Sequence, residues 1–244
     1  MTAAVALALV AAAAAGPLPF GPGERLTMRI TYAKMLGGRA QLSVEPGEGR
    51  PTYRFVATAK SQGFFAWLFR FRVSDHTVAE WDPRTTCSLG IEKHLREGRA
   101  TRDQKVVMDP VAGRAEVLDR KIAETTFELE PCVLDVLSAF FVTRVRGVPE
   151  REPLRLPVFD NGKSYVLEVR FVGRERLDLP KPLGRKVPTV IVEPVLAEGT
   201  GLFVKEGRLK IWLTDDERRI PVRLRSKVAV GSVSADLESY TPGE

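Results

Sequence analysis

Histidine, cysteine and serine are the side chains of this sequence best suited to chemistry, and few of them are placed to perform it. The chain has two histidines, His76 and His94, and neither has another His, a Cys or a paired carboxylate at metal-ligand spacing. A hydrolase could be assembled from Ser138, Asp135 and either histidine, because a nucleophilic serine needs a neighbouring base. Ser138, however, falls within a predicted helix and outside any G-x-S-x-G motif. We therefore predict no metal site and keep the hydrolase as the last alternative.

The two cysteines, Cys87 and Cys132, are the full thiol inventory. An even pair forms a disulfide more often than two free thiols in an oxidising compartment. A disulfide between them would close a loop of 45 residues. Closing a loop of that length stabilises a fold by on the order of 4 kcal/mol, as an upper figure. In a reducing compartment the same residues would be buried thiols. We predict a disulfide between Cys87 and Cys132.

Motifs for phosphates and cofactors are missing. The sequence has no P-loop and no G-x-G-x-x-G dinucleotide motif. Asp215-Asp216-Glu217 could bind a hard cation, but acidic residues at the tip of a predicted hairpin are typical of a solvated turn, and we interpret them so. We predict a protein that is not an enzyme and that carries no cofactor.

The densest aromatic segment is GFFAWLFRFRV, residues 63–73. Its side chains cannot alternate between a dry and a wet face with either the strand or the helix period. They either fill the core, line or gate an apolar ligand cavity, or contact a membrane surface. The candidates for a ligand cavity are aromatic residues of this segment and of the predicted helix, namely Phe64, Phe65, Trp67, Phe69, Phe140 and Phe141.

The elements that must position these residues are mostly strands. Residues 27–32 and several later segments alternate polar with apolar side chains, which is typical of an antiparallel sheet with one solvated face. Gly37-Gly38 and Asn161-Gly162 are predicted turns. The main helix is predicted from Cys132 to Arg146, where apolar residues recur at helical spacing. The predicted fold class is mainly β, a strongly curved antiparallel sheet or an incomplete β-barrel wrapping that helix.

Residues 209–240 predict three strands joined by two tight turns. A two-residue turn at Gly231-Ser232 would place Arg225 opposite Glu238, and opposite charges in such a pair are stabilising. Pro221 cannot donate a hydrogen bond to the neighbouring strand, so it predicts a bulge or an outward-facing position there.

The N-terminus is apolar and uncharged, with the sequence MTAAVALALVAAAAAG before Pro17. This composition predicts a signal peptide over residues 1–16, then a single β-rich domain over residues 23–241 and a periplasmic location. An ordinary Ala-rich helix is the alternative. No later segment approaches the ~20 apolar residues of a membrane span.

The net charge is +6 at pH 7, and the basic residues are spread through the strands. A solvated face accounts for this spread, and an anionic envelope surface as partner is the alternative. Export would exclude nucleic acid as an everyday partner. No sequence feature sets the oligomeric state.

Five short motifs stand out along the chain: GERL at residues 23–26, GGRA at 37–40, DVLSAFF at 135–141, IWLTDD at 211–216 and RIPV at 219–222. Together they resemble the bacterial envelope family catalogued as domain of unknown function 3108, over most of residues 23–240. The resemblance implies an exported protein with no established activity and no catalytic residues to transfer. In outline such families are similar to the curved, incomplete β-barrels of periplasmic lipoprotein carriers, where a sheet wraps a helix and an apolar cavity.

The sequence therefore predicts a non-catalytic periplasmic protein that binds a lipid, a lipidated protein or another apolar ligand in the cup of its sheet and serves envelope maintenance. The alternative is a structural or protein-interaction module with a filled core and a basic face that meets an anionic surface. The volume of the apolar cavity distinguishes the two functions.

Overall fold

The computed structural model describes residues 17–32, 35–49, 51–62, 73–98, 100–119, 122–196, 209–227 and 231–244. Its strands form one 14-stranded sheet, beside which lies the helix α2 (Val136–Arg146). The strands are β1 (Arg25–Tyr32), β2 (Met35–Pro46), β3 (Tyr53–Ser61), β4 (Ser74–Asp82), β5 (Cys87–Glu97), β6 (Ala100–Asp109), β7 (Arg114–Asp119), β8 (Ile122–Glu128), β9 (Leu154–Asp160), β10 (Lys163–Leu177), β11 (Val187–Leu196), β12 (Leu209–Thr214), β13 (Pro221–Lys227) and β14 (Ser232–Thr241).

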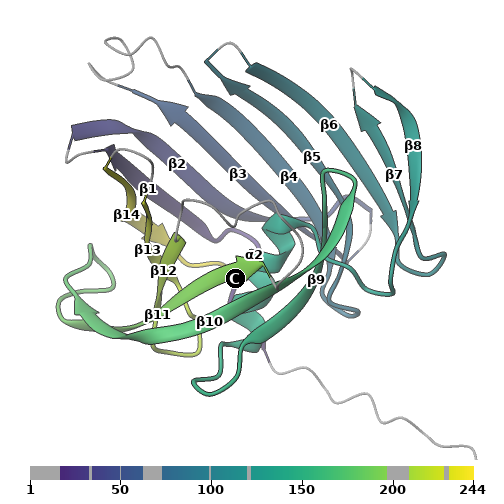
Figure 1. The fold of residues 1–244 in the computed structure, drawn as a ribbon. Helices are drawn as coiled ribbons and strands as arrows, with labels where there is room; N and C mark the ends of the chain where they lie inside the picture. The colour runs from purple at the N-terminus through teal and green to yellow at the C-terminus, as the bar shows by residue number, and fades with distance from the viewer. Residues whose placement is uncertain are drawn as a thin grey trace, which may run out of the picture.

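The order of the strands brings the two ends of the chain together in the middle of the sheet. From one edge the order runs β8 to β1 and then from β14 to β9, and every pairing is antiparallel. The edge strands β8 and β9 are consecutive in the chain, and α2 lies in the connection between them. Figure 1 shows β2 to β8 as one broad layer, with β9 and β10 crossing in front of it. The sheet is not closed into a barrel.

Side chains connect regions of the sheet that are far apart in strand order. The rings of Phe127 on β8 and Phe159 on β9 have centroids 5.4 Å apart. Lys93 on β5 forms a largely buried ion pair with Asp160 at the end of β9. Because β5 and β9 are separated by nine other strands in the sheet order, such contacts require a strongly curved sheet.

The interior beside α2 is packed with aromatic side chains. Phe141 of α2 stacks on Phe55 of β3 with ring centroids 3.9 Å apart. Phe20 meets both rings edge-on, and Trp81 lies 5.6 Å from Phe55. The helix contacts β3, β4 and β9. The predicted fold class, a mainly β antiparallel sheet with one main helix, is confirmed.

The helix begins later than the sequence predicts. Cys132 has a φ of +60°, which is left-handed and ends any helical run there. Leu134 is hydrogen-bonded to β9 through its backbone, which leaves it extended beside that strand. Asp135 is the N-cap, and its side chain accepts hydrogen bonds from the N–H groups of Leu137 and Ser138. The start predicted at Cys132 is therefore wrong, and the predicted end at Arg146 is confirmed.

The predicted disulfide between Cys87 and Cys132 is confirmed, with an S–S distance of 2.04 Å and Cα atoms 4.7 Å apart. It joins the first residue of β5 to the segment that precedes α2. Ser88 reinforces this junction, because its Oγ receives the backbone N–H of Asp135 and donates to the Asp135 carboxylate. The N-terminus of the helix is thereby tied to the sheet.

Two predicted turns have opposite outcomes. Asn161 and Gly162 have φ values of +50° and +73° and connect β9 to β10, as predicted. Gly37 and Gly38 instead lie inside β2, where the register with β1 shifts between Ile30 and Thr31. A Cβ on Gly38 would lie 2.4 Å from the Lys60 carbonyl oxygen. The glycines thus serve a bulge and a close strand approach, and the predicted turn at this position is wrong.

The closing hairpin also differs from its predicted register. Arg223 pairs with Asp236, and the pairing ends at Lys227 and Ser232, so Arg225 does not lie opposite Glu238. The connection is longer than the predicted two-residue turn, which shifts the pairing without changing the face that each residue occupies. The bulge predicted from Pro221 is confirmed, because the β12–β13 register shifts there.

No helix among the described residues combines the length and hydrophobicity needed to cross a membrane.

Candidate functional site

An open cleft of about 570 Å³ lies where α2 ends. Its walls come from the segment after the helix, from β10, β11 and β12, and from the turn that follows β12. Val192 and Leu213, which lie at its base, belong to the same core cluster as Phe141, so the cleft opens on the inner face of the sheet. It is a continuation of the packed interior that reaches solvent.

The floor of the cleft is apolar because cross-strand partners on these strands are apolar on the inner face. Phe171 lies opposite Val192, and Val190 lies opposite Leu213. Val192 and Leu213 are buried, whereas Phe171 and Val190 are half-buried and face the opening. The segment after the helix adds Val148 to this surface. The floor therefore offers aliphatic and aromatic surface to a ligand.

One side of the rim is held by a guanidinium shared between two carboxylates. Arg174 Nη2 lies 2.6 Å from Glu150 Oε1, and its Nε lies 3.1 Å from Asp215 Oδ2. Its guanidinium carbon also lies 5.1 Å from the centre of the Phe171 ring. The hydrogen bonds to Glu150 and Asp215 raise the pKa of Arg174. This side of the rim joins the segment after α2 to β10 and to the β12–β13 turn.

The other side of the rim is the turn between β12 and β13. Arg219 Nη1 donates a 2.9 Å hydrogen bond to the Arg144 carbonyl and so satisfies an acceptor in the last turn of α2. Asp216 accepts hydrogen bonds from Thr214 Oγ1 and from the Arg218 guanidinium. Burial acts to raise the pKa of Asp216, but these hydrogen bonds together outweigh it and the pKa is lowered. The turn is thus a fixed wall attached to the helix end.

Two rim charges have no ion-pair partner among the described residues. Arg146, the last residue of α2, and Glu217 in the β12–β13 turn both line the cleft and are exposed. The apolar floor suits a hydrocarbon group, and these two charges are available to polar groups attached to it. An apolar lining with a few polar groups is the usual composition of a ligand pocket.

The sequence predicted aromatic ligand-cavity residues elsewhere. Phe64, Phe65, Trp67 and Phe69 lie outside the described residues. Phe141 is fully buried in the aromatic core, and Phe140 is half-buried beside it; neither lines the cleft. Their role toward a ligand stays a prediction.

The hydrolase candidates are not assembled into a triad. Ser138 is fully buried, and its Oγ donates a 2.5 Å hydrogen bond to Asp135 Oδ2. Burial raises the pKa of Asp135, although the hydrogen bonds from Ser138 and Ser88 act to lower it. His76 and His94 lie on the exposed side of β4 and β5, with ring centroids 6.5 Å apart. The serine and the aspartate therefore cap and anchor α2.

His94 is placed between two carboxylates. Its Nδ1 lies 2.9 Å from Asp103 Oδ1, and its Nε2 lies 2.9 Å from Glu92 Oε1. The hydrogen bonds to Asp103 and then to Glu92 raise the pKa of His94. In the part of the chain that the structure describes, no three His, Cys, Asp or Glu residues are placed to hold a metal ion.

The cleft is not predicted by the sequence, although one sequence feature contributes to it. The IWLTDD and RIPV motifs at residues 211–216 and 219–222 supply Leu213, Asp215 and Arg219 to its walls. The acidic composition of the tip predicts only a solvated turn. It is a turn, and it also forms the rim.

The open antiparallel sheet, its single described helix and the cleft on the inner face define the class of this protein, which is a β-barrel-like fold. The chain belongs to the family described as Protein of unknown function (DUF3108), whose model matches residues 27–238. The family description names no catalytic class. The chain has no match among curated proteins.

A solved structure supports the fold. The chain is similar to a β-barrel-like protein of domain of unknown function DUF1849 from Brucella abortus, with a TM-score of 0.64 and 12% identity over 93% of this chain and 100% of that chain. A protein with a YmcC-like fold from Bacteroides fragilis has a TM-score of 0.35 and 10% identity over 92% of this chain and 98% of its own. The first similarity shows the fold alone.

Proposed function

We propose that this chain is an exported, periplasmic protein that serves envelope maintenance without catalysing a reaction. It binds the apolar part of a lipid, a lipidated protein or a similar amphiphile in the cleft beyond α2. The observation that carries the proposal is the apolar floor that opens to solvent inside a charged rim. Its volume of about 570 Å³ lies within the range of about 300–1,000 Å³ that ligand pockets occupy.

In this proposal the sheet wraps α2, and the cleft is the part of the cup that the helix leaves open. Contacts of α2 with β3 and β4 from one half of the sheet and with β9 from the other support the wrapping. The aromatic packing of Phe55 and Phe141 occupies the centre of the cup. The ligand is therefore held at the end of the cup, beside the helix C-terminus, and not around the helix.

A cleft-filling substitution tests the proposal. Val190 lies half-buried on the floor, so Val190→Trp places a large ring in the space that a ligand would occupy. Val172→Trp is the matched control, since Val172 is 41% exposed on β10 and does not line the cleft. We expect the apolar fluorescent probe N-phenylnaphthylamine to bind the wild type and the control, and to lose its binding in Val190→Trp.

Native mass spectrometry of the wild type purified from a bacterial envelope adds a second readout, the mass of any co-purified lipid. Lipid retained by the wild type and by Val172→Trp but not by Val190→Trp supports the proposal. A wild type that binds neither probe nor lipid, or equal binding in both variants, overturns it. The filled-core interaction module is then the better description.

Export is tested separately. A disulfide persists in oxidising compartments, so the bond between Cys87 and Cys132 supports a periplasmic location. When the full sequence is expressed, osmotic shock should release a protein that has lost its N-terminal signal peptide. A variant expressed without residues 1–16 should stay in the cytoplasm. Full-length chain retained in the cytoplasm would refute export.

A further inference from the structure

The outward face of the sheet carries an uneven distribution of charge across β12, β13, β14, β1, β2 and β3. Residues that are direct cross-strand partners project to the same face. The registers place nine basic side chains on this part of the face, which are Arg25, Arg54 and a further seven: Arg29, Arg39, Lys60, Lys210, Arg223, Arg225 and Lys227. On the described part of these strands the same face carries three carboxylates: Glu45, which lies opposite Arg54, Asp236 and Glu238. We name these seven residues the cationic face.

Several members of the cationic face lie directly opposite one another. Arg29 is the partner of Arg39, and Arg39 is the partner of Lys60, so three cations cross three neighbouring strands. Lys210 is likewise opposite Arg225. Like charges in direct cross-strand pairs are destabilising, and a merely solvated face would have little reason to hold them in line.

The acidic residues compensate only part of this charge. Glu238 accepts two hydrogen bonds from the Arg39 guanidinium, at 2.7 and 3.0 Å, and Asp236 pairs with Arg223. Lys60 and Lys227 are exposed and have no ion-pair partner among the described residues. A net positive surface therefore remains.

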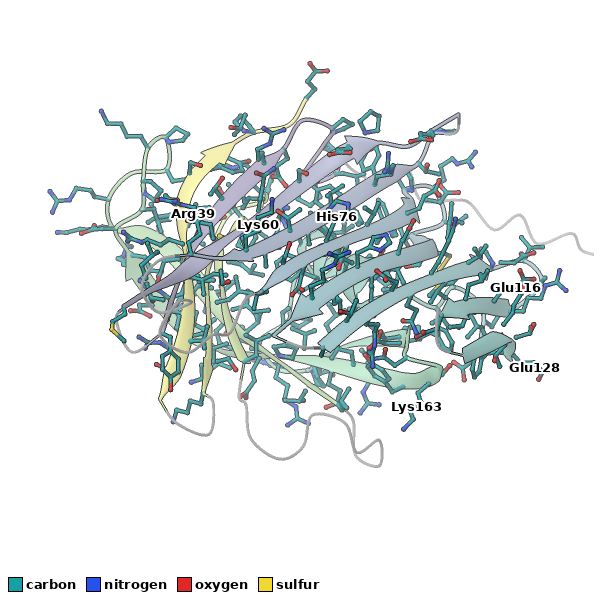
Figure 2. All side chains as sticks on the ribbon, turned by 90° about the horizontal axis from the view of Figure 1, so that it is seen from above. Arg39, Lys60, His76, Glu116, Glu128 and Lys163 are labelled. Atoms are coloured by element: carbon teal, nitrogen blue, oxygen red, sulfur yellow. A yellow bond between two sulfur atoms is a disulfide. The ribbon has the colours of Figure 1, made fainter. Side chains whose placement is uncertain are left out.

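The opposite end of the same broad layer carries charges of both signs. Figure 2 shows Arg39, Lys60 and His76 on successive strands of this layer, with Glu116 and Glu128 at its far edge. Arg114 lies opposite Glu128 at that edge, so the basic charge there is balanced, whereas the cationic face keeps a net positive charge. Such an uneven distribution orients a protein in the field of a charged surface.

We propose that the cationic face docks on an anionic phospholipid bilayer. The match rests on charge complementarity: a bilayer surface presents many negative head groups in one plane, and the cationic face presents its side chains across neighbouring strands of one sheet. The inference is independent of the cleft, because none of the seven residues lines it.

Co-sedimentation with vesicles tests the docking. The probes are vesicles of phosphatidylcholine alone and of phosphatidylcholine and phosphatidylglycerol in equal parts, each at low and high salt. We expect the purified protein to bind only the anionic vesicles and to dissociate as salt screens the attraction. The variant Lys60→Gln/Lys227→Gln should bind them about 30-fold more weakly, as two lost basic contacts imply.

The control is Lys105→Gln/Lys163→Gln, which removes the same net charge from exposed positions on β6 and β10 outside the cationic face. It should bind the anionic vesicles nearly as well as the wild type. The docking is overturned if the wild type ignores the anionic vesicles or if both double variants lose affinity equally, since the latter reports net charge alone. A thermal unfolding curve that matches the wild type shows that each variant is folded.

Discussion

Glu24 and Arg144 form a fully buried ion pair that joins the start of the sheet to α2. Arg144 Nη1 lies 2.6 Å from Glu24 Oε2, and its Nη2 lies 2.9 Å from Oε1. The guanidinium also donates to the carbonyl oxygen of Arg218, and the Tyr240 hydroxyl donates to Glu24. Burial, and then the Glu24 carboxylate, raise the pKa of Tyr240 to about 12. Segments from both ends and the middle of the chain thus meet at one pair of charges.

Removing the cation should therefore be costly. Arg144→Met leaves the Glu24 carboxylate buried without its partner, and we expect a loss of about 3–5 kcal/mol in the free energy of unfolding, measured by urea titration. Arg54→Met is the control, because its partner Glu48 is 87% exposed and such pairs contribute about 0–1 kcal/mol. Adding Glu24→Gln to Arg144→Met should recover part of the loss. A cost below about 1 kcal/mol for Arg144→Met would contradict this account.

The disulfide should contribute mainly by restricting the unfolded chain. Cys87 and Cys132 are 45 residues apart, for which loop-closure entropy gives an upper figure of about 4 kcal/mol. Urea unfolding of Cys87→Ser/Cys132→Ser should show a loss of up to that size. Reductant should lower the stability of the wild type and leave the double variant unchanged. An unreduced wild-type mass equal to that of the dithiol would refute the bond.

Features of the fold that depend on the residue types themselves can be predicted from the sequence. Asn161-Gly162 tolerates left-handed backbone and forms the turn, and Cys87 and Cys132 were an even pair with no other partner. Gly37-Gly38 has the same composition as a turn, but its role depends on the Lys60 carbonyl approaching from another strand. A contact with a residue that is distant in the sequence cannot be predicted from the residues around the two glycines.

The register of the last hairpin and the cleft escaped prediction for the same reason. Arg223 meets Asp236 because the whole hairpin pairs further from its tip than a two-residue turn allows. The cleft combines Phe171, Val190 and Leu213 from three strands with the end of α2. Alternation along a strand indicates which side chains share a face, but not where the helix ends and leaves them uncovered.

His94 should make stability depend on pH in a defined direction. Both ring nitrogens lie on carboxylates, which only accept hydrogen bonds, so the protonated ring fits the site and its folded pKa is raised above 6.5. The resulting stabilisation is complete below the unfolded pKa of about 6.5 and is lost as the pH rises through the higher folded pKa. The change should stay within about 1 kcal/mol, because the ring is exposed.

An NMR titration of the His94 ring measures this pKa directly. Asp103→Asn should lower it, since the hydrogen bond that the ring donates to Asp103 is the largest cause of the raised pKa. Glu116→Gln removes the same charge from β7 and should leave it unchanged. A His94 pKa at or below 6.5 in the wild type would show that the two carboxylates do not hold the proton.

Gly147 links the end of α2 to the cleft, and alanine should not be tolerated there. Its backbone has φ +68° and ψ 172°, a region that glycine alone occupies readily. An added Cβ would also lie 3.0 Å from Arg219 Nε, against the guanidinium that holds the Arg144 carbonyl. We expect Gly147→Ala to lower the free energy of unfolding by about 1–3 kcal/mol and to weaken binding of N-phenylnaphthylamine.

Two further variants separate the causes of that loss. Gly173→Ala is the matched glycine control, because a Cβ at Gly173 meets no atom within 4 Å, and it should be close to neutral. In an Arg219→Ala background the contact with the guanidinium is gone, so Gly147→Ala should cost only its backbone strain. An unchanged cost in that background would assign the whole effect to the backbone. A Gly147→Ala protein as stable as the wild type, with the probe still bound, would show that the helix end can move without disturbing the cleft.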